Sequence, residues 1–131
     1  MSKVLIVEDD AILQNAYNTV LSMEGFDVET APDGVEGLRV AQSKKPDVIL
    51  LDMLMPNMNG LQFLKLFEPK KHPETKIIVF SNIVSPDDVK QARELGVVKY
   101  LTKATFTPKE MVDTIKETLQ GAAEHGESSA D

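Results

Sequence analysis

Apolar residues gather in four short runs, separated by longer segments of mixed polarity. The runs cover residues 4–7, 48–51, 77–80 and 97–101. The first three are continuous rather than alternating, a pattern typical of strands that are buried on both faces, as in a parallel sheet covered by helices. A weaker, alternating run over residues 27–30 predicts a fifth strand at an edge of the sheet.

Segments with helical periodicity lie between these runs. The first carries one apolar stripe over residues 12–21 and stops at Gly25. Similar spacing predicts helices over residues 35–41 and 61–67, and the second of these ends before Pro69. Each of these helices follows one of the predicted strands.

Two later helices have clear N-terminal signals. Ser85 and Thr107 each offer an N-cap hydroxyl, followed by proline at the next position and by an acid three residues on. Their periodicity runs to about Gly96 and Gly121. Five strands thus alternate with five helices, and right-handed crossovers between parallel strands give a doubly wound α/β sheet with helices on both faces.

Composition fits one soluble domain. The chain has 131 residues, 42% apolar and 27% charged, which suits a single core that we assign to residues 1–121. Residues 122–131 are small and charged without periodicity, which predicts a disordered tail. The absence of cysteine excludes disulfides and thiolate metal sites. We expect a cytoplasmic protein, because the apolar runs are too short to cross a bilayer and the start of the sequence lacks the apolar core of a secretion signal.

The net charge of −7 argues against nucleic-acid binding by the domain itself, since such binding depends on Lys and Arg. The acidic surplus does not identify a partner.

Charged and hydroxyl residues follow four of the predicted strands, where each strand ends. They are Glu8, Asp9 and Asp10 after the first strand, Asp52 after the third, Ser81 after the fourth and Lys103 after the fifth. Ligands of open parallel sheets bind beyond the carboxyl ends of the strands. We therefore expect these side chains to converge on one edge of the sheet.

The converging carboxylates predict a divalent cation. Glu8, Asp9 and Asp52 would repel one another without a cation between them. Mg²⁺ fits better than Ca²⁺, because it binds through one or two carboxylates together with waters and phosphate oxygens. With the cation in place, the carboxylate of Asp52 can attack phosphorus and form an aspartyl phosphate, while Lys103 adds positive charge. Phosphoryl transfer needs little beyond such positioning and charge stabilisation.

Neighbouring residues have plainer interpretations. Asp10 is best interpreted as a helix N-cap, and three methionines as adaptable apolar filling. These methionines are Met53, Met55 and Met58. His72 lies in a charged loop and His125 in the predicted tail, so neither is expected to be a phosphodonor or a ligand. Asp52 differs, because it directly follows an apolar run, where an uncompensated charge would be costly.

Residues 4–10 and 52–60, the hydroxyl of Ser81 and the ammonium of Lys103 resemble, in order and spacing, the signature of receiver domains of two-component response regulators. The match spans residues 3–119. The resemblance implies a flavodoxin-like, CheY-like (βα)5 fold whose parallel strands lie in the order 2-1-3-4-5.

The resemblance also implies the ligands of a magnesium site. Asp52 corresponds to the phosphorylated aspartate and Asp9 to the direct Mg²⁺ ligand. Glu8 corresponds to the acid that reaches the ion through water, and the backbone carbonyl of Leu54 completes the set.

A switch and its partners follow from the same resemblance. Ser81 corresponds to the hydroxyl that turns toward the phosphoryl group, Tyr100 to the aromatic residue that swings inward behind it, and Lys103 to the lysine that pairs with the phosphate. A histidine kinase or phosphotransfer protein would donate the group. The surface of the fourth helix, fifth strand and fifth helix would then change and act on a downstream protein or a second copy. Neither a membrane nor a nucleic acid is an expected partner.

Four positions depart from the family pattern. Lys103 is followed by Ala104 rather than by a cis proline, and a cis bond to a non-proline residue costs roughly 3 kcal/mol. Asn82 replaces a small alanine and narrows the expected entrance to the site. Leu54 and Ile83 are both apolar at the positions that tune attack of water on the acyl phosphate, which predicts a long-lived phosphorylated state.

Three other kinds of protein share parts of this pattern. A phosphatase of the haloacid dehalogenase type needs a second aspartate two residues after the nucleophile, where this chain has Leu54, and a cap domain. A flavodoxin-like cofactor binder needs a phosphate-cradling loop after the first strand, where acids would repel phosphate. A pseudo-receiver would keep the fold for protein contacts alone. We expect a signalling switch rather than an enzyme, catalysing only its own phosphoryl transfer and autodephosphorylation.

Overall fold

Strands and helices alternate along the chain in a computed structural model that describes residues 2–82 and 85–124. The elements are β1 Lys3–Val7, α1 Ala11–Met23, β2 Asp27–Ala31, α2 Gly34–Lys44, β3 Val48–Leu51, α3 Gly60–Phe67, the 3-10 turn η1 Pro69–Lys71, β4 Lys76–Ser81, α4 Pro86–Leu95, β5 Lys99–Thr102 and α5 Pro108–Glu124. Each predicted strand and helix is present.

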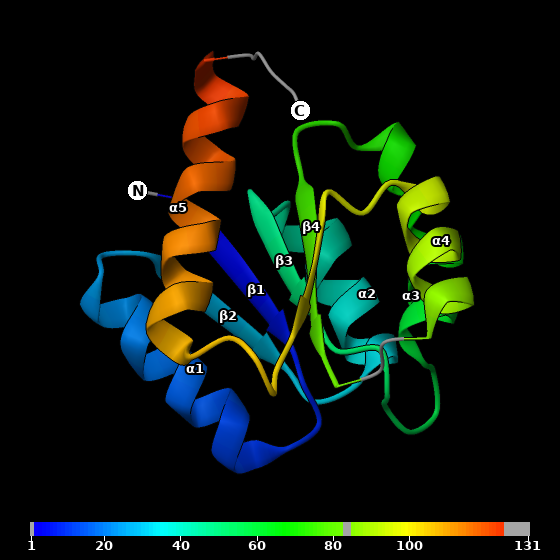
Figure 1. Ribbon diagram of the computed structural model, residues 1–131, viewed down its shortest axis with the longest axis horizontal. Helices are drawn as coiled ribbons and strands as arrows, with labels where there is room; N and C mark the ends of the chain where they lie inside the picture. Colours follow the sequence, from blue (N-terminus) through cyan, green and yellow to red (C-terminus); the bar gives the residue numbers. More distant parts are fainter. Residues whose placement is uncertain (1, 83–84, 125–131) are drawn as a thin grey trace.

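All neighbouring strands pair in parallel, in the order β2-β1-β3-β4-β5. This order confirms the predicted doubly wound (βα)5 fold. Helices α1 and α5 cover one face of the sheet, and α2, α3 and α4 cover the other (Figure 1). The carboxyl ends of the strands therefore meet at one edge, between the two helical layers.

The continuous apolar runs fill both layers, because side chains of a strand alternate between its faces. Leu5, Ile49 and Ile77 belong to the buried cluster under α2, α3 and α4. Val48 and Ile78, one position away, belong to the cluster under α1 and α5. A strand with apolar residues at every position is thus buried on both sides, as its sequence predicts.

Two details of the helices differ from the prediction. The apolar stripe of α1 buries Tyr17 and Leu21, but Ile12 at its start is 81% exposed. Helix α5 continues to Glu124, past the predicted end at Gly121, since Ala122 and Ala123 have high helix propensity. Residues 125–131 of the predicted tail lie outside the described residues, and the boundary of the domain stays a prediction.

Among residues 2–82 and 85–124, none of the helices is both long and apolar enough to cross a membrane.

Candidate functional site

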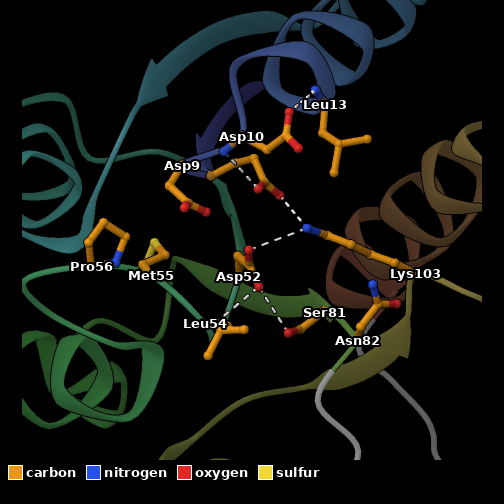
Figure 2. Close-up of a pocket in the computed structure, with 11 residues that line it drawn as sticks. Asp9, Asp10, Leu13, Asp52, Leu54, Met55, Pro56, Ser81, Asn82 and Lys103 are labelled. Atoms are coloured by element: carbon orange, nitrogen blue, oxygen red, sulfur yellow. Dashed lines mark hydrogen bonds and ion pairs between the residues drawn. The ribbon is translucent and has the colours of Figure 1, made fainter.

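A cavity of about 530 Å³ opens at the carboxyl edge of the sheet. Figure 2 shows the side chains around it, which come from the ends of β1, β3, β4 and β5, from the segments that follow them and, for Leu13, from α1. The lining residues are Glu8, Asp9, Asp10, Leu13, Asp52, Leu54, Met55, Pro56, Ser81, Asn82 and Lys103. The structure thus brings together the acids, the hydroxyl and the lysine that the strand ends predicted.

Asp52 lies directly after β3, where its backbone N–H donates to the carbonyl of Val7 on β1 at 3.1 Å. Its side chain is held by three donors. Oδ1 accepts from the hydroxyl of Ser81 at 2.9 Å and from the N–H of Leu54 at 3.2 Å, while Oδ2 lies 3.3 Å from Nζ of Lys103. The residue is only 6% exposed, so the orientation of its carboxylate is fixed by these contacts.

The backbone of Lys103 is held by β4, and its side chain forms ion pairs with two acids. Its backbone N–H donates to the carbonyl of Ser81 at 3.1 Å. Its ammonium lies 2.6 Å from Oε1 of Glu8 as well as 3.3 Å from Asp52 (Figure 2). Burial alone would lower the pKa of Lys103, but the hydrogen bond that it donates to Glu8 and the charges of Asp52 and Glu8 outweigh this effect and raise that pKa. The lysine therefore remains charged at neutral pH.

Glu8 and Asp9 end β1 in different environments. Glu8 is 3% exposed and accepts the N–H of Asp10 at Oε2, whereas Asp9 is exposed to solvent. Burial raises the pKa of Glu8, an effect that the hydrogen bond from Lys103 opposes. The local fold is fixed by Asp10, whose carboxylate caps α1 through the N–H groups of Ile12 and Leu13, as predicted.

The donor set fits a hard divalent cation. Glu8, Asp9 and Asp52 each offer a carboxylate oxygen, and these oxygens lie within 4.8 Å of one another. Three carboxylates face the single ammonium of Lys103, which leaves a surplus of negative charge at the cavity. An all-oxygen set of this kind, open to water on the side of Asp9, suits Mg²⁺ better than a softer metal.

The other predicted site residues lie around this core. The side chain of Leu54 is 66% exposed at the cavity. Tyr100 does not line the cavity and instead packs, half-buried, against the core under α2, α3 and α4. Burial, followed by the charges of Asp88 and Asp52, raises the pKa of Tyr100. The position of Tyr100 is therefore behind the site.

The structure describes the Lys103–Ala104 peptide and Asn82, two of the positions that depart from the family pattern. The Lys103–Ala104 peptide is trans, as are all peptide bonds in residues 2–82 and 85–124. Asn82 is exposed and lines the cavity entrance. Ile83 lies outside the described residues.

The three methionines belong to the apolar core, as predicted, and the described histidine packs on a core aromatic ring. Met53 and Met55 are buried in the core, and Met58 packs against it. His72 stacks on Phe67 with ring centroids 4.5 Å apart, away from the cavity. His125 lies outside the described residues.

Sequence reasoning missed several residues of the site. Leu13, Met55 and Pro56 form an apolar part of the cavity wall. Gln14 reaches from α1 to the ends of β1 and β2, donating through Nε2 to the carbonyls of Glu8 and Ala31. A polar residue one turn into the helix that follows an acidic strand end was the signal available for Gln14.

A parallel sheet in this order, with acids, a hydroxyl and a lysine at its carboxyl edge, defines a flavodoxin-like α/β domain equipped for phosphate chemistry. The chain belongs to the response regulator receiver domain family, whose model matches residues 4–116. Receiver domains of this family are phosphorylatable signalling switches.

Similar proteins agree with this family. The transcriptional regulatory protein CpxR homolog of Haemophilus influenzae is 37% identical over 124 residues, which cover 94% of this chain and 52% of that protein. A receiver domain structure from Methanospirillum hungatei JF-1 has a TM-score of 0.89 and 27% identity, covering 96% of this chain and 99% of that one. Chemotaxis protein CheY4 of Vibrio cholerae has a TM-score of 0.81 and 32% identity, covering 89% and 98%. The chain spans about half the length of the curated relatives it matches.

Proposed function

We propose that Asp52 accepts a phosphoryl group from the phosphohistidine of a histidine kinase or phosphotransfer protein, in a Mg²⁺-dependent reaction. The observation that carries this proposal is the environment of Asp52. Its carboxylate is almost buried, opens onto the cavity, and is held by Ser81, Lys103 and the N–H of Leu54. Such a fixed carboxylate with acids beside it is suited to nucleophilic attack only when extra positive charge is supplied.

In the proposed reaction a carboxylate oxygen of Asp52 attacks phosphorus, the P–N bond of the donor breaks, and the departing imidazole takes up a proton. Lys103 and Ser81 already donate to the two oxygens of Asp52, so both can move their hydrogen bonds to the incoming phosphoryl oxygens. Asp9, Asp52 and the carbonyl of Leu54 would hold Mg²⁺, and Glu8 would reach it through water. When bound, the ion would supply the positive charge that offsets the carboxylate and the phosphoryl group.

Signal output would follow through the surface of α4, β5 and α5. Movement of Ser81 toward the phosphoryl group, followed by Tyr100, biases an equilibrium between two packings of this surface. Its exposed side chains carry mixed charges, which suits a downstream protein or a second copy as partner. On α4 and β5 they are Lys90, Arg93, Glu94 and Lys99. The exposed Lys109, Asp113 and Lys116 of α5 lie on the side that faces α1, where Lys116 pairs with Glu24. We place the switch in the cytoplasm, and the net charge of −7 opposes direct contact of the domain with nucleic acid.

The proposed chemistry is limited to the domain's own phosphoryl transfer and autodephosphorylation. Leu54 projects at the cavity with an apolar side chain that cannot orient water. We therefore infer that the phosphorylated state is long-lived.

The test is the intact mass of the protein after incubation with acetyl phosphate and Mg²⁺. We expect a gain of one phosphoryl group that requires Mg²⁺, persists in Asp47→Asn and is absent in Asp52→Asn. Asp47 is a matched control, because it lies at the opposite edge of the sheet and accepts the N–H of Lys3. No gain with acetyl phosphate or with phosphorylated histidine donors would instead favour a pseudo-receiver that acts by protein contact alone.

A further inference from the structure

Gln14 links two strands at the edge that carries the site. From the first turn of α1, its Nε2 donates to the carbonyl of Glu8 at 3.1 Å and to the carbonyl of Ala31 at 3.2 Å. Ala31 ends β2 and also accepts the N–H of Glu8 at 3.0 Å. One side-chain amide therefore ties Glu8 to the neighbouring strand just where the regular ladder ends.

The ladder itself does not hold the next peptide. Strand β1 ends at Val7, whose carbonyl accepts the N–H of Asp52. The carbonyl of Glu8 lies one residue beyond this strand, and the hydrogen bond that it accepts comes from Gln14. The orientation of the Glu8–Asp9 peptide thus depends on a helix side chain rather than on sheet pairing.

This peptide joins two of the three carboxylates that converge at the cavity. A peptide unit is planar, so a hydrogen bond that fixes its carbonyl also fixes the directions in which the chain leaves it at both ends. Glu8 and Asp9 stand at these two ends, one buried and one exposed. Their spacing from Asp52 is therefore set in part by Gln14, although Gln14 does not line the cavity.

We propose that Gln14 is a positioning residue of the cation site, which sets the geometry of Glu8 and Asp9 by holding the peptide between them. The proposal rests on the proposed function, because it concerns the site at which Mg²⁺ would bind. Changing a residue that orients the ligands of a metal without touching it typically weakens metal binding roughly 10- to 100-fold.

The experiment compares Gln14→Met with Gln42→Met. Methionine keeps the length and helix propensity of glutamine but cannot donate a hydrogen bond. Gln42 is a matched control, because it is exposed on α2, on the other face of the sheet. Amide NMR spectra are recorded without metal and during a Mg²⁺ titration, and phosphorylation by acetyl phosphate is followed at saturating Mg²⁺.

We expect Gln14→Met to shift the metal-free amide signals of Asp9 and Asp10 and to weaken Mg²⁺ binding about 10-fold. Its phosphorylation rate at saturating Mg²⁺ should stay within about twofold of wild type, since Asp52, Ser81 and Lys103 are untouched. A general loss of stability would not produce this separation of affinity from rate. Gln42→Met should match wild type in each measurement.

The outcomes separate this inference from the function on which it rests. If wild type responds to Mg²⁺ and Gln14→Met binds it as tightly as Gln42→Met does, the positioning role is wrong and the proposed function stands. A weaker affinity without any metal-free shift at Asp9 also overturns the role, because the peptide would not have moved. If wild type itself shows no response to Mg²⁺, the proposed function fails and this inference fails with it.

Discussion

Polar groups differ in burial and pairing between the two edges of the sheet. At the amino edge, where the strands begin, Lys3 pairs with Asp27 at 2.5 Å and lies 3.8 Å from Glu29, and all three side chains are partly exposed to water. The buried hydroxyl of Thr75 there donates to the carbonyl of Pro46 at 2.7 Å. At the carboxyl edge, by contrast, Glu8 and Asp52 share the ammonium of Lys103, with the carboxylate of Asp9 close by, and Glu8 and Asp52 are almost fully buried.

The comparison separates structural from functional polar groups. At the amino edge Lys3 also lies near more than one acid, but the side chains of Asp27 and Glu29 are partly exposed, so water screens their charge. At the carboxyl edge the negative surplus weakens the fold unless further positive charge arrives. Paired variants at the two edges test this difference.

The largest effect is expected from removing the ammonium group of Lys103 at the carboxyl edge. Lys103→Met leaves Glu8 and Asp52 buried without their positively charged partner. In the absence of metal, the free energy of unfolding should therefore fall by about 2 kcal/mol. This loss is smaller than the roughly 3–5 kcal/mol lost when a fully buried ion pair is broken, because the cavity admits water. Lys76→Met at the amino edge removes only an exposed bond to the carbonyl of Pro73 and should change little. Urea denaturation of both variants checks this, and equal losses would contradict the comparison.

A smaller effect is expected from Asp9. Asp9→Asn should weaken Mg²⁺ binding by at least about 10-fold, comparable with or larger than the effect of an outer-shell change. Asp10→Asn is its matched control, because asparagine caps a helix as well as aspartate does. The readout is a Mg²⁺ titration followed by NMR. Similar losses in both variants would mean that bulk negative charge, rather than a ligand at position 9, attracts the ion.

Two buried hydroxyls sharpen the comparison further. Thr75→Val leaves the carbonyl of Pro46 without its donor and should cost about 1 kcal/mol of stability. Its phosphorylation should be unchanged. Ser81→Ala should instead remove the hydroxyl that links the phosphoryl group to α4 and β5. Phosphorylation should then no longer shift the NMR signal of Tyr100. The idea fails if Ser81→Ala transmits the shift as wild type does.

The smallest effect concerns the lifetime of the phosphorylated state. Leu54→Asn places a hydrogen-bonding group at the cavity, and it should speed dephosphorylation about threefold, because one net hydrogen bond contributes about 0.5–1 kcal/mol. Leu66→Asn is the control, since Leu66 is an equally apolar, 55% exposed residue on α3 that does not line the cavity. Loss of the phosphoryl group is followed by intact mass. An unchanged rate in Leu54→Asn would show that the apolar side chain does not set the lifetime.

Much of the fold could be predicted because its signals are local. Continuous apolar runs predicted the buried strands, and the hydroxyl-proline-acid pattern at Ser85 and Thr107 predicted the starts of α4 and α5. The end of α5 was wrong, since a single glycine at position 121 does not stop a helix that continues into alanines. The exposure of Ile12 was also missed, because periodicity does not reveal how far a helix extends beyond the sheet.

The members of the site could be predicted, but not the contacts among them. A topological rule, that strand ends meet at one edge, was enough to bring Asp52, Ser81 and Lys103 together. The bond between Lys103 and Glu8 joins residues 95 positions apart, and it was not foreseen. The hydrogen bonds of Gln14 could not be predicted for the same reason, because one of its acceptors is a carbonyl on β2.

The most direct test of the central claim is an amide NMR titration of wild type with beryllofluoride, which imitates a phosphoryl group on aspartate, in the presence and absence of Mg²⁺. The account predicts Mg²⁺-dependent shifts at the carboxyl edge, centred on Asp52 and extending to Ser81, Lys103 and Tyr100. The amino edge around Thr75 should remain unchanged, and Asp52→Asn should abolish the response. Equal shifts at both edges, or shifts that persist without Mg²⁺ or in Asp52→Asn, would contradict it.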